Sequence, residues 1–153
     1  MKILIGEDNI ANQEVLREML ELRGYEVTIA NNGVEVLQEL ESWTPDLLLL
    51  DIQMPMMDGL EVIRRLRRNE PHCALPVIAV TAYAMRQDSE RTAAAGFDGY
   101  VSKPIVWRTL LGEIDRVLLS SRRAAPASNG AVSHPDEGRL PAGGQQLRLE
   151  KNP

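Results

Sequence analysis

Five side chains able to bind a cation or a phosphoryl group stand at or just after the ends of short apolar runs. They are Glu7, Asp8, Asp51, Thr81 and Lys103. Taken singly, each could be a helix cap, a strand former or a solvated surface residue. The apolar runs before them are typical of strands that alternate with helices, and the carboxyl ends of parallel strands meet at one edge of a sheet. We therefore expect the five side chains to lie together.

Three carboxylates at one edge would repel one another, by about 3 kcal/mol for a pair about 5 Å apart at an effective dielectric of about 20. Lys103 supplies a single positive charge, and a divalent cation bound by oxygen atoms would supply the rest. Mg²⁺ suits a few carboxylates together with a phosphate, and Mn²⁺ could substitute for it. We expect Glu7 and Asp8 to hold the metal directly or through water. Asp51 and the backbone carbonyl of Gln53 would be further ligands.

Asp51 is the candidate phosphoryl acceptor. A carboxylate can attack phosphorus and hold the phosphoryl group as a mixed anhydride. Phosphoryl transfer depends mainly on positioning and on charge stabilisation, so the neighbours of the acceptor decide its chemistry. We expect Lys103 to pair with the carboxylate before transfer and with the phosphoryl group afterwards. The hydroxyl of Thr81 would donate a hydrogen bond to a phosphoryl oxygen.

The elements that must position these residues alternate along the chain, because apolar runs predict strands and helical periodicity between them predicts helices. We expect strands at 3–5, 27–30, 47–50, 77–80 and 100–101, and helices near 15–20, 36–40, 60–68, 86–95 and 107–118. The central three strands are apolar at consecutive positions, which suits parallel strands buried on both faces. The pattern predicts an open, doubly wound α/β sheet whose ligand site lies at the carboxyl ends of the strands.

The composition changes near residue 120. Residues 1–119 carry 12 Lys+Arg and 19 Asp+Glu, a net charge of −7, whereas residues 120–153 carry 5 and 3, a net charge of +2. We predict one folded domain, 1–119, and a mostly disordered tail, 120–153, whose start could continue the last helix. The acidic charge of the domain argues against nucleic acid as its direct ligand.

The chain carries no sign of membrane insertion or secretion. No apolar run approaches the length needed to span a bilayer, and acidic residues come too early for a signal peptide. The single cysteine, Cys73, excludes an internal disulfide. A reducing, cytoplasmic setting is therefore expected.

Four segments together resemble the response-regulator receiver domain of two-component signalling. They are ILIGEDN (3–9), DLLLLDIQMPMMDG (46–59), VIAVTAYAM (77–85) and GYVSKPI (99–105). The resemblance covers residues 2–119, and its closest form is the receiver found in hybrid histidine kinases and in stand-alone regulators. It implies a flavodoxin-like (βα)5 fold with a parallel five-stranded sheet in the strand order 2-1-3-4-5.

The resemblance also implies a phosphoryl donor and one backbone feature. The phosphoryl donor would be a phosphohistidine on a sensor histidine kinase or on a histidine phosphotransfer protein. The Lys103–Pro104 peptide bond would be cis, a form that costs little free energy before proline. Gly6 departs from the family, which more often has a bulky apolar residue there, and this departure predicts a slightly underpacked first strand.

The helix at 86–95 is expected to be the most weakly attached, because its apolar face is mainly alanine, which buries little area. The resemblance implies that Thr81 and Tyr100 change rotamer on phosphorylation. The surface made by this helix, the strand at 100–101 and the helix at 107–118 would then change shape and signal to a downstream protein. Phosphorylation would shift populations of two states that exist beforehand.

Three other functions fit parts of the pattern. An aspartate-nucleophile phosphatase usually has a second acid two residues after the nucleophile, and Gln53 at that position disfavours turnover. We expect no enzyme activity beyond promotion of its own phosphorylation and dephosphorylation. A phosphorylation-independent binding module would be favoured by loss of an acidic or lysine member, and none is lost. Relay of the phosphoryl group to a further phosphotransfer partner stays open beside terminal output.

Overall fold

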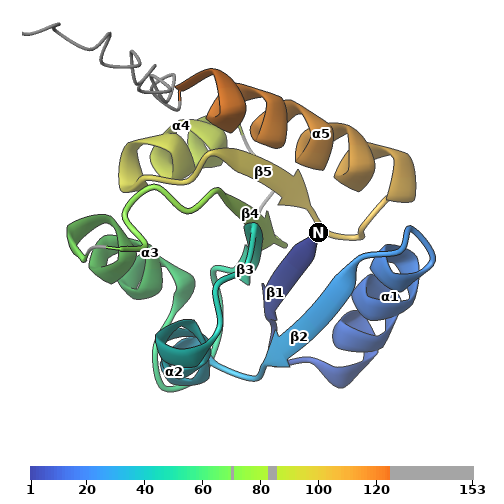
Figure 1. Ribbon diagram of the computed structural model, residues 1–153, viewed down its shortest axis with the longest axis horizontal. Coiled ribbons are helices and arrows are strands. Elements are labelled where there is room, and N and C mark those ends of the chain that lie inside the picture. Colours follow the sequence, from blue (N-terminus) through green and yellow to red (C-terminus); the bar gives the residue numbers. More distant parts are fainter. Residues whose placement is uncertain (70, 83–85, 125–153) are drawn as a thin grey trace, which may run out of the picture.

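Five short strands form one parallel sheet. The strands are β1 (Lys2–Gly6), β2 (Glu26–Ala30), β3 (Leu47–Asp51), β4 (Val77–Thr81) and β5 (Gly99–Ser102). The computed structural model describes residues 1–69, 71–82 and 86–124, with 86–89 described for the backbone alone. Neighbouring strands pair in parallel in the order β2-β1-β3-β4-β5, which confirms the predicted sheet (Figure 1).

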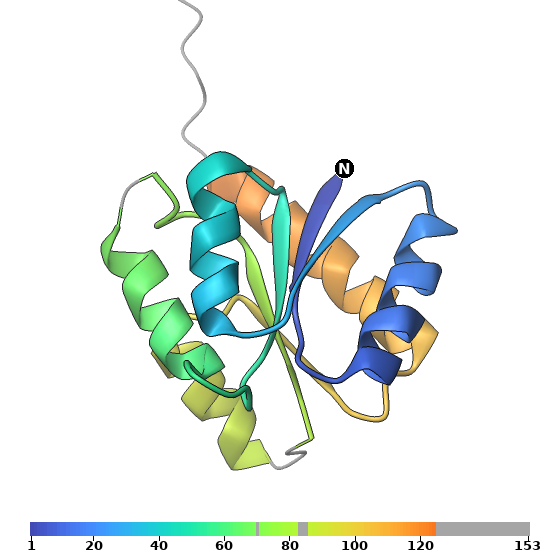
Figure 2. The same ribbon diagram turned by 90° about the horizontal axis from the view of Figure 1, so that it is seen from below.

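Five helices cover the two faces of this sheet. They are α1 (Ile10–Glu21), α2 (Gly33–Ser42), α3 (Gly59–Arg68), α4 (Arg86–Ala95) and α5 (Trp107–Ala124). Helices α1 and α5 cover one face, and α2, α3 and α4 cover the other (Figure 2). Within the described ranges, no helix is both long and apolar enough to cross a membrane.

The central strand β3 is buried on both faces. Leu48 and Leu50 pack in the core on the side of α2 and α3, while Leu47 and Leu49 pack in the core on the side of α1 and α5. All four side chains are fully buried. Because successive side chains of a strand point to opposite faces, a strand covered on both sides needs consecutive apolar residues. Burial of the strand on both faces thus explains the run of consecutive apolar residues in the sequence.

Three helices begin at the edge of the sheet where the strands end. Each starts with an Asn or Asp whose side chain accepts a hydrogen bond from a backbone N–H of the first turn, which is a favourable helix start. These pairs are Asn9 with Asn12, Asn32 with Glu35, and Asp58 with Glu61. The positive ends of the three helix dipoles therefore lie along this edge, where they favour negative charge.

Arg67, near the end of α3, joins segments far apart in the sequence. Its guanidinium donates hydrogen bonds to the carbonyl oxygens of Gly96, Cys73 and Leu75, at 2.9, 3.0 and 2.7 Å. It also pairs with Asp98 at 2.8 Å. The carboxyl end of α4, which Gly96 follows directly, is thereby tied to α3.

The rest of α4 is less buried. Among its described side chains, Thr92 is buried and Ala95 is half-buried, while Glu90, Arg91, Ala93 and Ala94 are exposed. An alanine-rich helix was expected to bury little area, and the described part of this helix does so.

The last helix runs past the predicted domain boundary. It continues beyond residue 119 to Ala124, and the hydroxyl of Ser121 donates a hydrogen bond to the carbonyl oxygen of Val117. The tail prediction concerns 120–153, and its residues 125–153 lie outside the described part of the chain.

The prediction of an underpacked first strand at Gly6 is wrong. A Cβ atom added to Gly6 would lie 2.8 Å from a methyl carbon of Leu50 and 2.8 Å from one of Val36. These two larger side chains, from β3 and α2, occupy the space that a side chain at position 6 would fill. The glycine is complementary to its neighbours.

Replacing Gly6 by Val should therefore lower the free energy of unfolding by about 1–3 kcal/mol, the usual cost of adding bulk to a packed core. Urea denaturation followed by circular dichroism measures the change. Gly112→Ala is the matched control, because Gly112 lies on α5 with nothing within 4 Å of an added Cβ. That variant should be more stable than the wild type by about 0.5–1 kcal/mol. A Gly6→Val protein as stable as the wild type would mean that the space is open.

Candidate functional site

The chemistry-bearing residues follow the carboxyl ends of four strands. Glu7 and Asp8 come directly after β1, and Asp51 and Thr81 are the last residues of β3 and β4. Lys103 comes directly after β5. The parallel register places Gly6 beside Leu50, Asp51 beside Val80 and Thr81 beside Ser102, so these strand ends are level.

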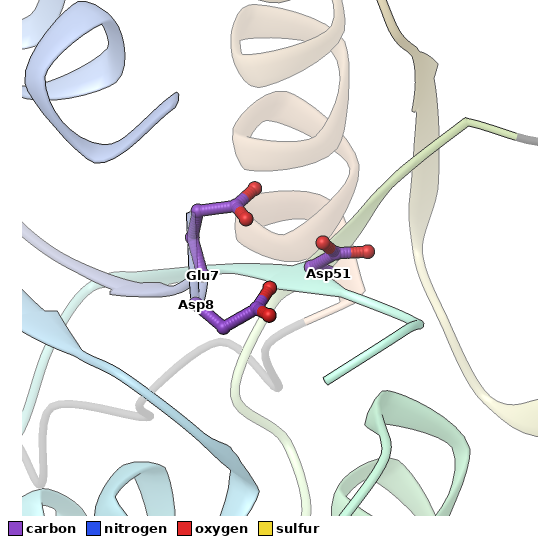
Figure 3. Close-up of side chains that lie close together, drawn as sticks. All are labelled: Glu7, Asp8 and Asp51. Carbon is purple, nitrogen blue, oxygen red and sulfur yellow. The ribbon is translucent and has the colours of Figure 1, made fainter. Parts of the chain in front are cut away.

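The three carboxylates meet as predicted. One oxygen from each of Glu7, Asp8 and Asp51 lies within 4.8 Å of the others, and the side chains converge in Figure 3. Glu7 and Asp51 are only 1% and 5% exposed, whereas Asp8 lies at the surface. The group therefore combines two buried acids with one that solvent can reach.

Lys103 bridges the two buried acids. Its Nζ lies 2.7 Å from Glu7 Oε2 and 2.8 Å from Asp51 Oδ2. Burial alone would lower the pKa of Lys103, but its hydrogen bonds to Asp51 and Glu7 and their charges outweigh burial and raise it above 10.5. The contribution of this ammonium to stability is thus fully present at neutral pH, and it is lost only as the pH rises through the raised pKa. The pairing with Asp51 was predicted, and the pairing with Glu7 is an addition.

Both oxygens of the Glu7 and Asp51 carboxylates are engaged. Glu7 Oε1 accepts a hydrogen bond from the backbone N–H of Asn9, and Asp51 Oδ1 accepts one from the backbone N–H of Gln53, both at 3.0 Å. The Gln53 peptide thus lies next to the acceptor carboxylate. Asp8 has no side-chain partner among the residues that the structure describes.

A divalent cation fits the charge of this group. Three carboxylates and one ammonium sum to −3 + 1 = −2, and carboxylate oxygens are the ligands that Mg²⁺ prefers. Asp8, unpaired within the described chain, and Asp51 can each offer an oxygen lone pair. An open hollow beside them is lined by Asp8, Ile52, Gln53, Met54, Pro55 and Asp58, and it gives access from solvent.

Thr81 and Tyr100, the predicted switch residues, lie on neighbouring strands. Thr81 is fully buried at the end of β4, and Tyr100 is half-buried on β5. The backbone N–H of Tyr100 donates to Oε1 of Glu113 on α5 at 3.0 Å. The Lys103–Pro104 peptide bond is cis, as predicted.

Two glycines at helix starts along this edge of the sheet make close approaches that the sequence did not reveal. A Cβ atom on Gly59 would lie 2.4 Å from the carbonyl oxygen of Asp51, and one on Gly33 would lie 2.4 Å from that of Met57. Gly33 also donates its N–H to Met57 at 3.2 Å. Each glycine directly follows the Asn or Asp that caps a helix. The sequence shows this position, but it does not show which backbone segment packs against the glycine, because the tertiary fold brings that segment there.

Gln13, on the first turn of α1, is a further residue that the sequence did not single out. Its side-chain amide is buried, 2.6 Å from the carbonyl oxygen of Glu7. Its position between Asn12 and Glu14, just before the helix predicted near 15–20, gave no sign of this contact. The Gln13 amide thus contacts the backbone of the loop that carries Glu7 and Asp8, here called the acidic loop.

Comparison with known proteins gives a consistent result. Residues 3–115 match the family of response regulator receiver domains. The polar-differentiation response regulator DivK of Brucella anthropi is 44% identical over 103 residues, which cover 67% of this chain and 84% of that protein.

Solved structures agree with this match. The receiver domain of a signal transduction histidine kinase from Syntrophus aciditrophicus has a TM-score of 0.72 at 32% identity, with 85% of this chain and 98% of that chain covered. The receiver domain of the sensor histidine kinase PA1611 from Pseudomonas aeruginosa has a TM-score of 0.70 at 34% identity, with 76% and 96% covered. That structure has a magnesium ion coordinated in its active-site cleft.

Replacing Lys103 by Met would leave Glu7 and Asp51 buried without their shared cation. We expect the free energy of unfolding to fall by about 3 kcal/mol in the absence of divalent cations, because the buried carboxylates lose their compensation. Urea denaturation at neutral pH in EDTA measures this loss. Lys2→Met, at an exposed position, is the matched control and should change stability by less than about 1 kcal/mol.

A double variant tests the cause of that loss. Adding Asp51→Asn to Lys103→Met removes one of the two uncompensated charges and should recover part of the stability. If the double variant were as unstable as Lys103→Met alone, charge compensation would not be the role of the lysine.

Proposed function

Since the chain belongs to the response regulator receiver domain family, we propose that Asp51 accepts a phosphoryl group from a phosphohistidine donor in a Mg²⁺-dependent reaction. The donor would be a sensor histidine kinase or a histidine phosphotransfer protein. One observation carries the proposal: a buried carboxylate at a strand end is held between an ammonium and a backbone N–H, with two further acids within 4.8 Å. This arrangement suits charge stabilisation of a phosphoryl group better than any other chemistry.

The transfer is a displacement at phosphorus. An oxygen of the Asp51 carboxylate forms the new bond to phosphorus while the bond from phosphorus to the donor imidazole nitrogen breaks. The bonding pair returns to that nitrogen, and the product on this chain is an acyl phosphate. Lys103 and the Gln53 N–H hold the carboxylate in place beforehand, which reduces the reorganisation that the reaction needs.

Asp8 and Asp51, with Glu7 and the Gln53 carbonyl, would hold the Mg²⁺ ion, and Mn²⁺ could take its place. When bound, the ion supplies positive charge for the oxygens of the transferring group. Glu7 already bonds Lys103 and Asn9, so we propose that it acts on the metal mainly through its charge or through water.

The output would arise from the residues next to the acceptor. After transfer, Lys103 bonds a phosphoryl oxygen and the Thr81 hydroxyl donates to another. Tyr100 then swings inward, and the surface of α4, β5 and α5 changes its shape for a downstream protein. Because Glu113 holds the backbone N–H of Tyr100, the movement at this residue would be confined to its side chain.

The chain would promote its own phosphorylation and dephosphorylation without turning over a separate substrate. Gln53, two residues after the acceptor, cannot serve as the general acid of a phosphatase, since an amide does not titrate. Onward relay to a histidine phosphotransfer partner is the second candidate. It is favoured by the similarity to receiver domains of histidine kinases.

A small phosphoryl donor tests the acceptor directly. In acetyl phosphate with Mg²⁺, the intact mass should rise by one phosphoryl group, and the group should be acid-labile or hydroxylamine-sensitive as an acyl phosphate is. Asp51→Asn should abolish the rise, as should EDTA. Asp115→Asn, at an exposed position on α5, is the matched control and should be labelled as the wild type is. Unchanged labelling of Asp51→Asn would refute the assignment.

Hydrogen exchange tests the switch. We expect phosphorylation to change the exchange rates of backbone amides in 86–102, because α4 buries little area and β5 carries Tyr100. Mass spectrometry of the chain with and without acetyl phosphate and Mg²⁺ measures the rates. Residues 26–30 of β2, at the opposite edge of the sheet, should be unaffected. Equal rates across 86–102 in the two states would contradict the proposed output surface.

A further inference from the structure

Gln13 is a buried polar side chain that the proposed reaction does not use. It is 8% exposed, and its Nε2 donates to the carbonyl oxygen of Glu7 at 2.6 Å and to Oδ1 of Asn31 at 2.9 Å. An amide nitrogen has two hydrogens, and both are used here. The side chain therefore has a fixed orientation behind the acidic loop.

The bonds from Gln13 continue to α2. Asn31 donates its backbone N–H and its side-chain Nδ2 to Oε2 of Glu35, at 2.7 and 2.8 Å. The Asn31 side chain, whose Oδ1 accepts the hydrogen bond from Gln13, is therefore itself held by Glu35. One chain of hydrogen bonds thus links α1, the loop after β2 and the first turn of α2.

The consequence for the acidic loop follows from the planarity of the peptide group. Glu7 donates its backbone N–H to the carbonyl of Ala30 at 3.1 Å, while its own carbonyl is held by Gln13. That carbonyl lies in the same plane as the N and Cα atoms of Asp8. Fixing it therefore fixes the N and Cα atoms of Asp8, so that only rotations about the N–Cα bond and the side-chain bonds are left to move the Asp8 carboxylate.

Asp8 needs such a constraint more than the other acids do. It is exposed and has no side-chain partner within the described residues, although like charges on Glu7 and Asp51 lie within 4.8 Å. Repulsion would turn an unrestrained Asp8 toward water. A fixed Glu7–Asp8 peptide limits how far the Asp8 carboxylate can move away from Asp51 before any cation arrives.

We propose that Gln13 is a positioning residue for the divalent-cation site, and that it raises cation affinity by fixing the Glu7–Asp8 peptide. This inference rests on the proposed function in that Mg²⁺ is taken as the ligand of Asp8 and Asp51. Gln13 does not contact the cation. It acts through the Glu7 carbonyl, as residues behind metal ligands do when they orient them.

The test is a titration with MgCl2 alone, followed by the backbone amide resonances of the loop after β1. Gln13→Met keeps the length of the side chain but removes both donors. We expect its Kd for Mg²⁺ to rise about tenfold, a typical effect of losing a residue that orients a metal ligand. At saturating Mg²⁺, the rate of labelling by acetyl phosphate should return close to that of the wild type. A Gln13→Met protein with the wild-type Kd would overturn the proposal.

Two further variants separate positioning from general stability. Leu20→Val, two turns further along α1 and fully buried, lowers stability without touching the loop, so its Kd should stay at the wild-type value. An equal rise of Kd in Leu20→Val would overturn the proposal. Asn31→Ala, at an exposed position, should raise the Kd less than Gln13→Met does. The double variant should be no worse than Gln13→Met, and additive losses would overturn the linked chain of bonds.

The two proposals fail differently. If the wild type binds Mg²⁺ but takes no phosphoryl group on Asp51, the phosphoryl-accepting function fails, and the Kd comparison still decides the role of Gln13. If Asp51 is labelled normally and Gln13→Met has an unchanged Kd, the positioning role alone fails.

Discussion

Mutual repulsion of three carboxylates at one edge of the sheet is the constraint on which the rest of the structure depends. Glu7 and Asp51 are buried and share one ammonium, that of Lys103, so the group keeps an excess of negative charge. Such an arrangement is costly in the interior, where removing charge from water is not fully offset by pairing. The excess negative charge fits the proposed binding of a cation and a phosphoryl group at this edge.

A rigid framework holds these charges together. Strand β3 is buried on both faces and ends at Asp51, so the acceptor cannot move without disturbing the core. Three capped helices begin at the same edge and direct their dipoles toward it. The close approach of Gly59 to the Asp51 carbonyl lets the loop after β3 fold back tightly on the acceptor. The acidic group is thus held by backbone N–H groups as well as by the ammonium of Lys103.

Much of this could be predicted from the sequence, because the strand ends are marked by apolar runs and the reactive residue types stand directly after them. The meeting of the acids and the pairing of Lys103 with Asp51 were predicted correctly from these positions. The strand order, which the resemblance to receiver domains implied, was also correct. Other contacts between segments distant in the sequence were not predicted. Gly6 was expected to leave a gap, yet side chains of β3 and α2 fill it. Gln13 stands in a stretch that indicates only a helix, so its contact with Glu7 was not predicted. The continuation of the last helix past residue 119 was left open by the sequence, and the structure extends it to Ala124.

The attachment of α4 has a mechanical consequence. Arg67 binds the carbonyl of Gly96, directly after the helix, and so anchors that end to α3 and to the segment before β4. A displacement of the helix that keeps the Arg67–Gly96 hydrogen bond would be a tilt about the carboxyl end of α4. A helix of 10 residues is about 15 Å long, so a tilt of about 10° would carry its amino-terminal end through roughly 2.6 Å. That end, at Arg86, is the end of α4 nearest in the sequence to Thr81, so the displacement would be largest on the side of the helix that follows β4.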